Sequence, residues 1–221
     1  KEELETENVT AVVAGATSNL DRHIKNMLRF GVPVVVSINR FASDTDSELE
    51  AIEEASRASG ASRVCRTEVH SKGGEGGEAL ANAVVDSIHD HVAAGRPFLP
   101  LVSPDDSIEN KVEAIATRMY GASNVTFEAP ALRQLKKIKE WGYGNLPVCM
   151  AKTQYSFSHD AGMLGAPSGF ELPVREFRLN AGAGFVVAIL GSIMTMPGLP
   201  KRPAANDMDM DEDGNLVGVF G

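Results

Sequence analysis

The chain has 221 residues, of which 43% are hydrophobic, so it is long enough to bury one large core or two smaller ones. Its net charge is −9 and its basic residues are dispersed, which argues against non-specific nucleic-acid binding and leaves solubility as the meaning of the charge. No apolar run approaches the ~20 residues of a membrane-spanning helix, and the acidic N-terminus has no signal-peptide pattern, so we expect no membrane partner.

The two cysteines, Cys65 and Cys149, fall in apolar surroundings and lack metal-ligand spacing. We interpret them as buried thiols of a cytoplasmic protein rather than as a disulfide or a catalytic pair. No metal site is predicted, because His89 and His91 are two residues apart on an expected helix and do not share a face.

The first 30 residues are expected to be helical. Apolar residues recur at helical spacing from Leu20 to Leu28, and Gly31 takes the position of a C-terminal cap. His23 lies off this apolar stripe, and we interpret it as a surface residue rather than a ligand contact.

Residues 32–77 predict a βαβα unit. Strands are expected at 32–38 and 62–69, and the first is an apolar run rich in β-branched residues, typical of a buried parallel strand. The polar loops that follow the two strands, 39–46 and 70–77, leave the same edge of the sheet. Ligands of open α/β sheets bind outside the carboxyl ends of the strands, so these loops are the first candidates for a site.

The two helices of this unit are expected to pack on the sheet. The first is predicted to begin at Asp44 or Asp46 and to end at Gly60. The second follows the glycine run and ends at Gly95. In the first helix, Leu49, Ile52 and Ala55 are predicted to face the sheet. The second helix carries Leu80, Val84, Ile88 and Val92 at i, i+4 spacing.

A second, smaller module is expected after an extended crossing at residues 96–102. It is predicted to hold a helix from Ser103 to Gly121, with Ile108, Val112, Ile115 and Met119 inward, and a helix over 129–141, with Leu132, Leu135 and Ile138 inward. Strands are expected at 146–151, 170–179 and within 182–193, with a rigid turn at 196–200. The basic cluster on the second helix, Arg133, Lys136, Lys137 and Lys139, is interpreted as a solvated face rather than an anion site.

The polar loops carry the residues best suited to binding chemistry. Asn39 has an amide that both donates and accepts, as a purine edge or a neighbouring loop requires, although many α/β proteins place Asn at a strand end for structural reasons. Phe41 and His70 are flat side chains that could stack on a planar heterocycle, unless Phe41 packs locally. The glycines at 73–77 permit a ligand to approach backbone N–H groups before a helix, but no Gly-Lys-Ser/Thr motif occurs in the chain.

Several stretches together resemble the formate–tetrahydrofolate ligase family, also called formyltetrahydrofolate synthetases. They are found at residues 19–24, 30–36, 38–41, 44–48, 72–77, 143–156 and 194–200. The resemblance covers this whole chain but only the C-terminal part of the family's sequence, and the family's P-loop with its lysine would lie upstream of Lys1. It implies an α/β fold in which residues 1–98 are the last βα units of a P-loop-type parallel sheet and residues 99–221 form a smaller α/β module.

The resemblance implies a ligase in cytoplasmic one-carbon metabolism. In the family, ATP with Mg²⁺ phosphorylates formate, and N10 of tetrahydrofolate attacks the formyl phosphate to give 10-formyltetrahydrofolate, ADP and phosphate. Phosphoryl transfer depends on the P-loop and its lysine, so we expect this chain to be inactive alone, and we assign it no catalytic residue. The family is commonly homo-oligomeric.

The folate side of the family's site maps onto this chain. The aromatic pair that sandwiches the folate corresponds to Phe41 and His70, and the family's usual tryptophan at the second position is replaced here by an imidazole of smaller stacking area. Residues expected to line the same cleft towards the nucleotide are Asn39, Ser71, Lys72, Gly73 and Gly74. Residues 145–156 match closely but suggest no chemical role beyond packing.

Two other functions compete with this one. A non-catalytic module that binds folate or a partner chain would show binding without turnover. A P-loop-like metal chaperone or GTPase relative would need a phosphate loop, which this sequence lacks.

Overall fold

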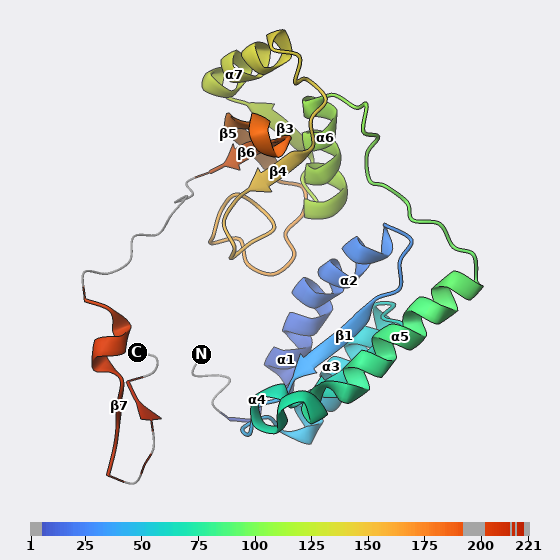
Figure 1. Cartoon of the computed structure of the whole chain (residues 1–221), viewed down its shortest axis with the longest axis vertical. Helices are drawn as coiled ribbons and strands as arrows, with labels where there is room; N and C mark the ends of the chain where they lie inside the picture. The colour runs from blue at the N-terminus through green and yellow to red at the C-terminus, as the bar shows by residue number, and fades with distance from the viewer. Residues whose placement is uncertain (1–5, 192–201, 213, 215, 219–221) are drawn as a thin grey trace. The chain divides into compact units, whose positions relative to one another are not determined.

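The computed structural model describes residues 6–191, 202–212, 214 and 216–218 and shows a mixed α/β chain (Figure 1). It forms two compact units, Lys1–Gly191 and Ser192–Gly221. The expected division between residues 98 and 99 stays a prediction. The resemblance at 194–200 and the turn predicted there lie outside the described residues.

The N-terminal segment is helical, as predicted. Helix α1 (Val9–Gly15) passes through a π-helical turn, η2 (Ala16–Leu20), into α2 (Asp21–Leu28). The Asn8 side chain caps α1 by accepting a hydrogen bond from the Ala11 N–H at 3.0 Å.

Strands β1 (Val35–Asn39) and β2 (Arg63–Thr67) pair in parallel, with Val35 opposite Arg63 and Asn39 opposite Thr67. This confirms the predicted βαβ topology. Strand β1 is less buried than predicted: Ile38 is its one buried residue, and the others are partly or largely exposed. In the described part of the chain these two strands form a sheet of their own.

Helix α3 (Asp46–Ala58) is capped by Thr45, not by Asp44 or Asp46 as predicted. The Thr45 hydroxyl accepts from the Glu48 N–H, and the Glu48 carboxylate accepts from the Thr45 N–H at 3.2 Å. This reciprocal capping box satisfies two N–H groups, whereas a lone aspartate cap would satisfy one. Asp44 instead accepts from the Phe41 N–H at 2.8 Å and closes the turn after β1.

The predicted loop at 70–77 is helical. Residues Val69–Lys72 form α4, Gly73–Gly77 form a 3-10 turn (η3), and α5 (Glu78–Ala93) continues from it. Gly73 has φ 59°, a left-handed conformation that favours glycine. A side chain at Gly76 would meet the Glu68 carbonyl at 2.5 Å, so that position needs glycine to pack against the end of β2.

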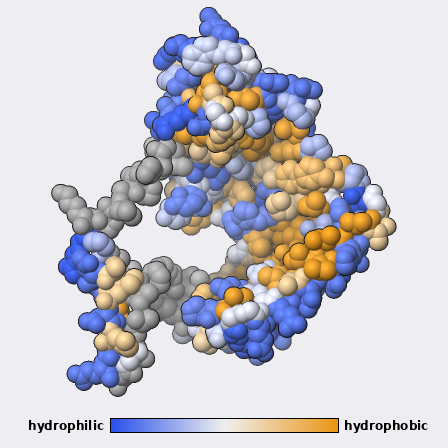
Figure 2. Space-filling view, viewed as in Figure 1, coloured by the Kyte–Doolittle hydropathy of each residue, from blue (hydrophilic) through white to orange (hydrophobic). Residues whose placement is uncertain are grey.

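Helix α5 carries the apolar residues at the predicted helical spacing, but most of them are exposed. Its buried residues are the small Ala83 and Ser87, which leave room for close packing against β2. Ile88 is 53% exposed and Val92 70% exposed. Figure 2 shows apolar surface along this helix, because no described residue covers these side chains.

Helix α6 (Ile108–Ala114) continues as a π-helical turn, η4 (Ile115–Tyr120), and ends at Gly121 as predicted. Its N-cap is Ser107 rather than Ser103, because residues 103–106 form a turn of their own. Ile108 and Val112 are fully buried.

Helix α7 (Ala129–Glu140) packs on a four-stranded sheet of order β3-β5-β6-β4. Its inward residues are Ala131, Leu135 and Ile138, whereas Leu132, predicted to be inward, is exposed. Residues three or four apart lie on one face of a helix, so Ala131, Leu135 and Ile138 form the buried stripe, which includes Ala131 in place of the predicted Leu132.

The sheet comprises β3 (Asn124–Phe127), β4 (Val148–Ala151), β5 (Glu171–Asn180) and β6 (Phe185–Leu190). Strand β5 pairs with β3 in parallel and with β6 antiparallel, and β6 pairs with β4 in parallel. The predicted strands at 146–151 and 170–179 are confirmed, and the one expected within 182–193 is confirmed as β6, whereas β3 was not predicted.

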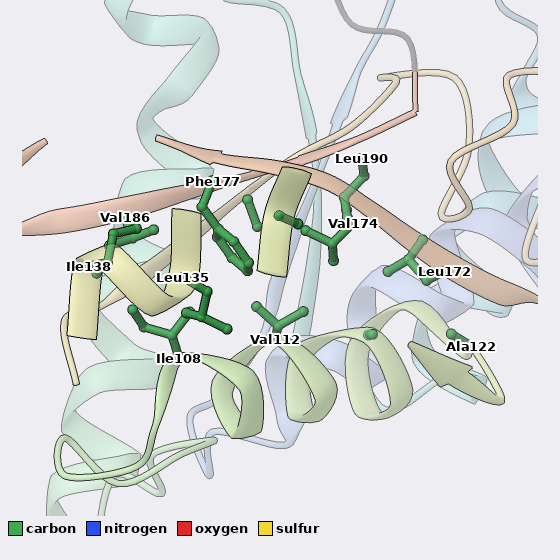
Figure 3. Packing of buried hydrophobic residues seen from close by; sticks show 13 residues of the cluster. Ile108, Val112, Ala122, Leu135, Ile138, Leu172, Val174, Phe177, Val186 and Leu190 are labelled. Carbon is green, nitrogen blue, oxygen red and sulfur yellow. The ribbon is translucent and has the colours of Figure 1, made fainter. Parts of the chain in front are cut away.

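The core lies between this sheet and its helices (Figure 3). Leu172, Val174 and Phe177 alternate inward along β5, and a bulge between Val174 and Glu176 keeps Phe177 in the core. Cys149 in β4 is exposed and Cys65 in β2 is half-buried, so the prediction of two buried thiols is wrong for Cys149; both are free.

The second unit holds a short 3-10 turn, η6 (Ala204–Asp207), and a ladder of β7 (Asp209–Met210) with β8 (Leu216–Val217). Among the residues described in both units, no helix is long and apolar enough to cross a membrane.

Candidate functional site

The carboxyl ends of β1 and β2 bring the two predicted segments side by side. The strand pairing ends at Asn39 and Thr67, and one further hydrogen bond, from the Arg40 N–H to the Thr67 carbonyl at 2.9 Å, extends it. The chain therefore leaves the sheet at Phe41 on one strand and at Glu68 on the next.

A pocket of about 410 Å³ opens at this edge. It is lined by Arg40, Phe41, Ala42, Glu68, His70 and Ser71. Three predicted site residues, Phe41, His70 and Ser71, thus lie in one pocket. The Phe41 side chain is 60% exposed, so it is available to a ligand instead of being used in local packing.

Short-range hydrogen bonds fix the pocket's two walls. Phe41 and Asp44 close a turn through the Asp44 carboxylate and the Phe41 carbonyl, which accepts from the Asp44 N–H at 3.1 Å. On the other wall, the Glu68 carbonyl accepts from the N–H groups of Ser71 and Lys72, and the Glu68 N–H donates to Gly76 at 3.1 Å. These bonds fix the backbone of both walls close to the strand ends.

The pocket contains a carboxylate that sequence reasoning did not assign. The Lys72 ammonium donates to Glu68 at 2.6 Å and lowers the pKa of that carboxyl group, and the positive charge of Arg40 lowers it further. Glu68 is therefore ionised at neutral pH. Glu68 lies near the end of the second predicted strand, at the sheet edge where a site was expected. This position in the sequence could have indicated Glu68 as a site residue.

The other predicted nucleotide residues do not line this pocket. Asn39 is exposed at the end of β1, and Gly73 and Gly74 belong to the 3-10 turn. The ammonium of Lys72 is held by Glu68. Within the described ranges, no group of three or more histidine, cysteine, aspartate or glutamate side chains is placed to hold a metal ion.

Comparison with known proteins gives one consistent family. Residues 1–220 match the family model described as formate–tetrahydrofolate ligase. The chain is 50% identical over 220 residues to the formate–tetrahydrofolate ligases of Staphylococcus aureus strains JH9, Newman and JH1, an alignment that covers all of this chain and 39% of each relative. The chain therefore spans less than half the length of these relatives. A match over nearly every residue, together with this identity, means that the chain belongs to the formate–tetrahydrofolate ligase family.

Proposed function

We propose that this chain supplies the folate-binding side of an ATP-dependent ligase that forms 10-formyltetrahydrofolate from formate and tetrahydrofolate through formyl phosphate. The observation that supports this most directly is the pocket at the ends of β1 and β2, which combines two aromatic rings with an ionised carboxylate. The family of the chain supplies the reaction class.

The chemistry of the pocket suits a pterin ring. A pterin is flat and carries N–H donors on one edge. In our proposal the rings of Phe41 and His70 contact its faces and the Glu68 carboxylate accepts from its N–H edge. Glu68 keeps one oxygen for this role, because Lys72 is bonded to the other.

The described residues do not fit a triphosphate site as they stand. Lys72 is paired with Glu68, the glycine run is closed into a 3-10 turn, and the 221 residues contain no Gly-Lys-Ser/Thr motif. We therefore assign no reaction step that involves ATP or Mg²⁺ to the residues of this chain. Formate activation is assigned, as a proposal, to the part of the relatives that this chain does not match.

Two features support a larger sheet around β1 and β2. The two strands are parallel, and the apolar stripe of α5 is exposed in the described part of the chain. Parallel sheets are normally covered on both faces. We propose that the pair belongs to a P-loop-type parallel sheet in a cytoplasmic enzyme that forms homo-oligomers.

The test is tetrahydrofolate binding by calorimetry, together with formation of 10-formyltetrahydrofolate from formate and ATP. We expect the 221-residue chain to bind tetrahydrofolate and to give no product. Its His70→Trp variant should bind more tightly, because an indole offers a larger stacking surface. Absence of binding, or weaker binding after His70→Trp, would contradict the proposal for this pocket.

The pairing of Lys72 with Glu68 also fits a second function, because it leaves this lysine unavailable to a phosphate group. A non-catalytic module would bind folate or a partner chain without turnover. The intact mass of the protein made in its source cells separates the two. A mass well above 23.5 kDa, with a Gly-Lys-Ser/Thr loop in the added sequence, supports the ligase, whereas a mass near 23.5 kDa supports the binding module.

A further inference from the structure

A second polar pocket is lined by residues from η2 and α2, from the end of η4 and from the loop that follows β4. It encloses about 150 Å³ and shares no lining residue with the pocket at the strand ends. Its lining residues are Asn19, His23, Tyr120, Lys152, Gln154, Ser156 and Phe157. None of them is acidic.

Lys152 is the fixed positive charge of this pocket. Its ammonium group donates to the carbonyl of Thr153 at 2.9 Å and to that of Ser156, and it lies 5.2 Å from the centre of the Tyr120 ring. Two of its three N–H donors are used in this way, and the third is left over. In the described part of the chain Lys152 has no ion pair.

His23 is the second N–H donor at this pocket. Its ring lies 4.8 Å from the ring of Phe157, which fixes it at the pocket wall. Partial burial and the neighbouring charge of Lys152 both lower the pKa of His23. Burial also lowers the pKa of Lys152, and no carboxylate is near enough to offset either effect.

Neutral donors complete the site. The Asn19 amide donates one N–H to the Gly165 carbonyl at 3.3 Å and keeps another. The amide of Gln154 is exposed and makes no side-chain hydrogen bond to the described residues. The pocket therefore offers several free N–H donors around a fixed positive charge.

The two walls of this pocket come from sequence stretches that the proposed function leaves unexplained. Residues 19–24 and 143–156 both carry the resemblance to the family, and neither contributes to the pocket at the strand ends. They are more than a hundred residues apart in sequence, yet the first contributes Asn19 and His23 to this pocket and the second contributes Lys152, Gln154 and Ser156. A role in ligand binding would account for their meeting here.

We propose that this pocket is an oxyanion site, in which a phosphate or carboxylate group binds between Lys152 and His23. The Lys152 ammonium donates a charge-assisted hydrogen bond to such oxygens, and the His23 ring donates a second N–H, which gains positive charge when the bound anion stabilises the imidazolium. The pocket volume suits one small group instead of a whole nucleotide or pterin. The ligand is either a free inorganic anion or the carboxylate of an organic acid, and the two share this chemistry.

The experiment is a titration of the protein, in the length its source cells make, with inorganic phosphate and separately with acetate. Chloride keeps the ionic strength constant. Calorimetry measures affinity, and NMR of the His23 imidazole measures its pKa. We expect saturable binding of at least one anion and an upward shift of the His23 pKa when it binds, because the anion stabilises the imidazolium. Saturation by phosphate alone identifies an inorganic ligand, and saturation by acetate identifies a carboxylate.

The variants distinguish this site from general attraction to a positive surface. His23→Asn and Lys152→Met should each weaken binding by about tenfold or more, the effect of losing one charge-assisted hydrogen bond. Lys25→Met is the matched control, because Lys25 lies on the same helix and is paired with Asp21 at 2.8 Å outside the pocket. His23→Asn keeps the test valid if Lys152→Met fails to fold. Absence of saturable binding by either anion would overturn the proposal, as would equal affinity in His23→Asn and the unmodified protein.

Discussion

Replacing Phe41 with alanine should weaken tetrahydrofolate binding, and the structure gives the size of the effect. The Phe41 side chain is 60% exposed. An aromatic side chain can bury about 200 Å², so a ligand can cover at most about 120 Å² of this ring. At about 25 cal/mol per Å² the upper limit is about 3 kcal/mol. A ligand that covers one face leaves part of the ring open, so we expect a loss of ~1–3 kcal/mol, equal to a rise of roughly 5- to 150-fold in Kd.

Calorimetric titration of tetrahydrofolate into the Phe41→Ala variant measures this change. Phe98→Ala is the matched control, because Phe98 is 61% exposed and lies outside the pocket, stacked on Phe30 with ring centres 5.7 Å apart. Circular dichroism confirms that both variants are folded. An unchanged Kd in Phe41→Ala, or an equal loss in Phe98→Ala, would refute the assignment of Phe41 to the site.

Three further predictions concern the scaffold that holds the site. Thr45→Ala should lower the free energy of unfolding by about 1 kcal/mol by removing the cap of α3, whereas Thr17→Ala, on an exposed helical position, should change it less; urea denaturation measures both. Leu172→Ala should cost ~2–5 kcal/mol in the same assay because Leu172 is fully buried, and the exposed Leu132→Ala is its control; a loss under ~1 kcal/mol would contradict the described core. Backbone N–H groups lower the pKa of Glu48 from 4.5, so its carboxylate stabilises the fold above pH 4.5 and this stabilisation is lost as the pH falls through the lower, folded pKa; Glu48→Gln should flatten the dependence of thermal stability on pH there, and an unchanged dependence would contradict the role given to these bonds.

The sequence predicted elements best where local pattern and tertiary packing agree. Strand β5 alternates apolar and charged residues, and Leu172 and Val174 are buried as that alternation indicates. The cap of α3 was mispredicted although its pattern was present, because Thr45 and Glu48 have the spacing of a capping box. A rule based on single capping residues chose the neighbouring aspartates instead.

Periodicity predicted which residues of α5 share a face but not whether that face is covered. Val84, Ile88 and Val92 do lie at helical spacing, yet the helix contacts β2 through Ala83 and Ser87. The choice of face depends on neighbouring elements, which an isolated stretch of sequence does not contain.

The candidate site was predicted in part. Phe41, His70 and Ser71 could be placed together because parallel strands end at one edge of a sheet. The conformation of the glycine run at 73–77 could not be predicted, because glycines permit both an open loop and the 3-10 turn that packs Gly76 against Glu68. The pairing of Lys72 with Glu68 likewise depends on the short helix α4, which no sequence pattern indicated.

The most direct test of the proposed folate side is a crystal structure of the protein, in the length its source cells make, grown with tetrahydrofolate. We expect the pterin ring to contact Phe41 and His70, and the Glu68 carboxylate to accept hydrogen bonds from the N–H edge of the pterin. A pterin ring bound elsewhere, for example in the apolar groove lined by Phe30 and Tyr120, would contradict the account.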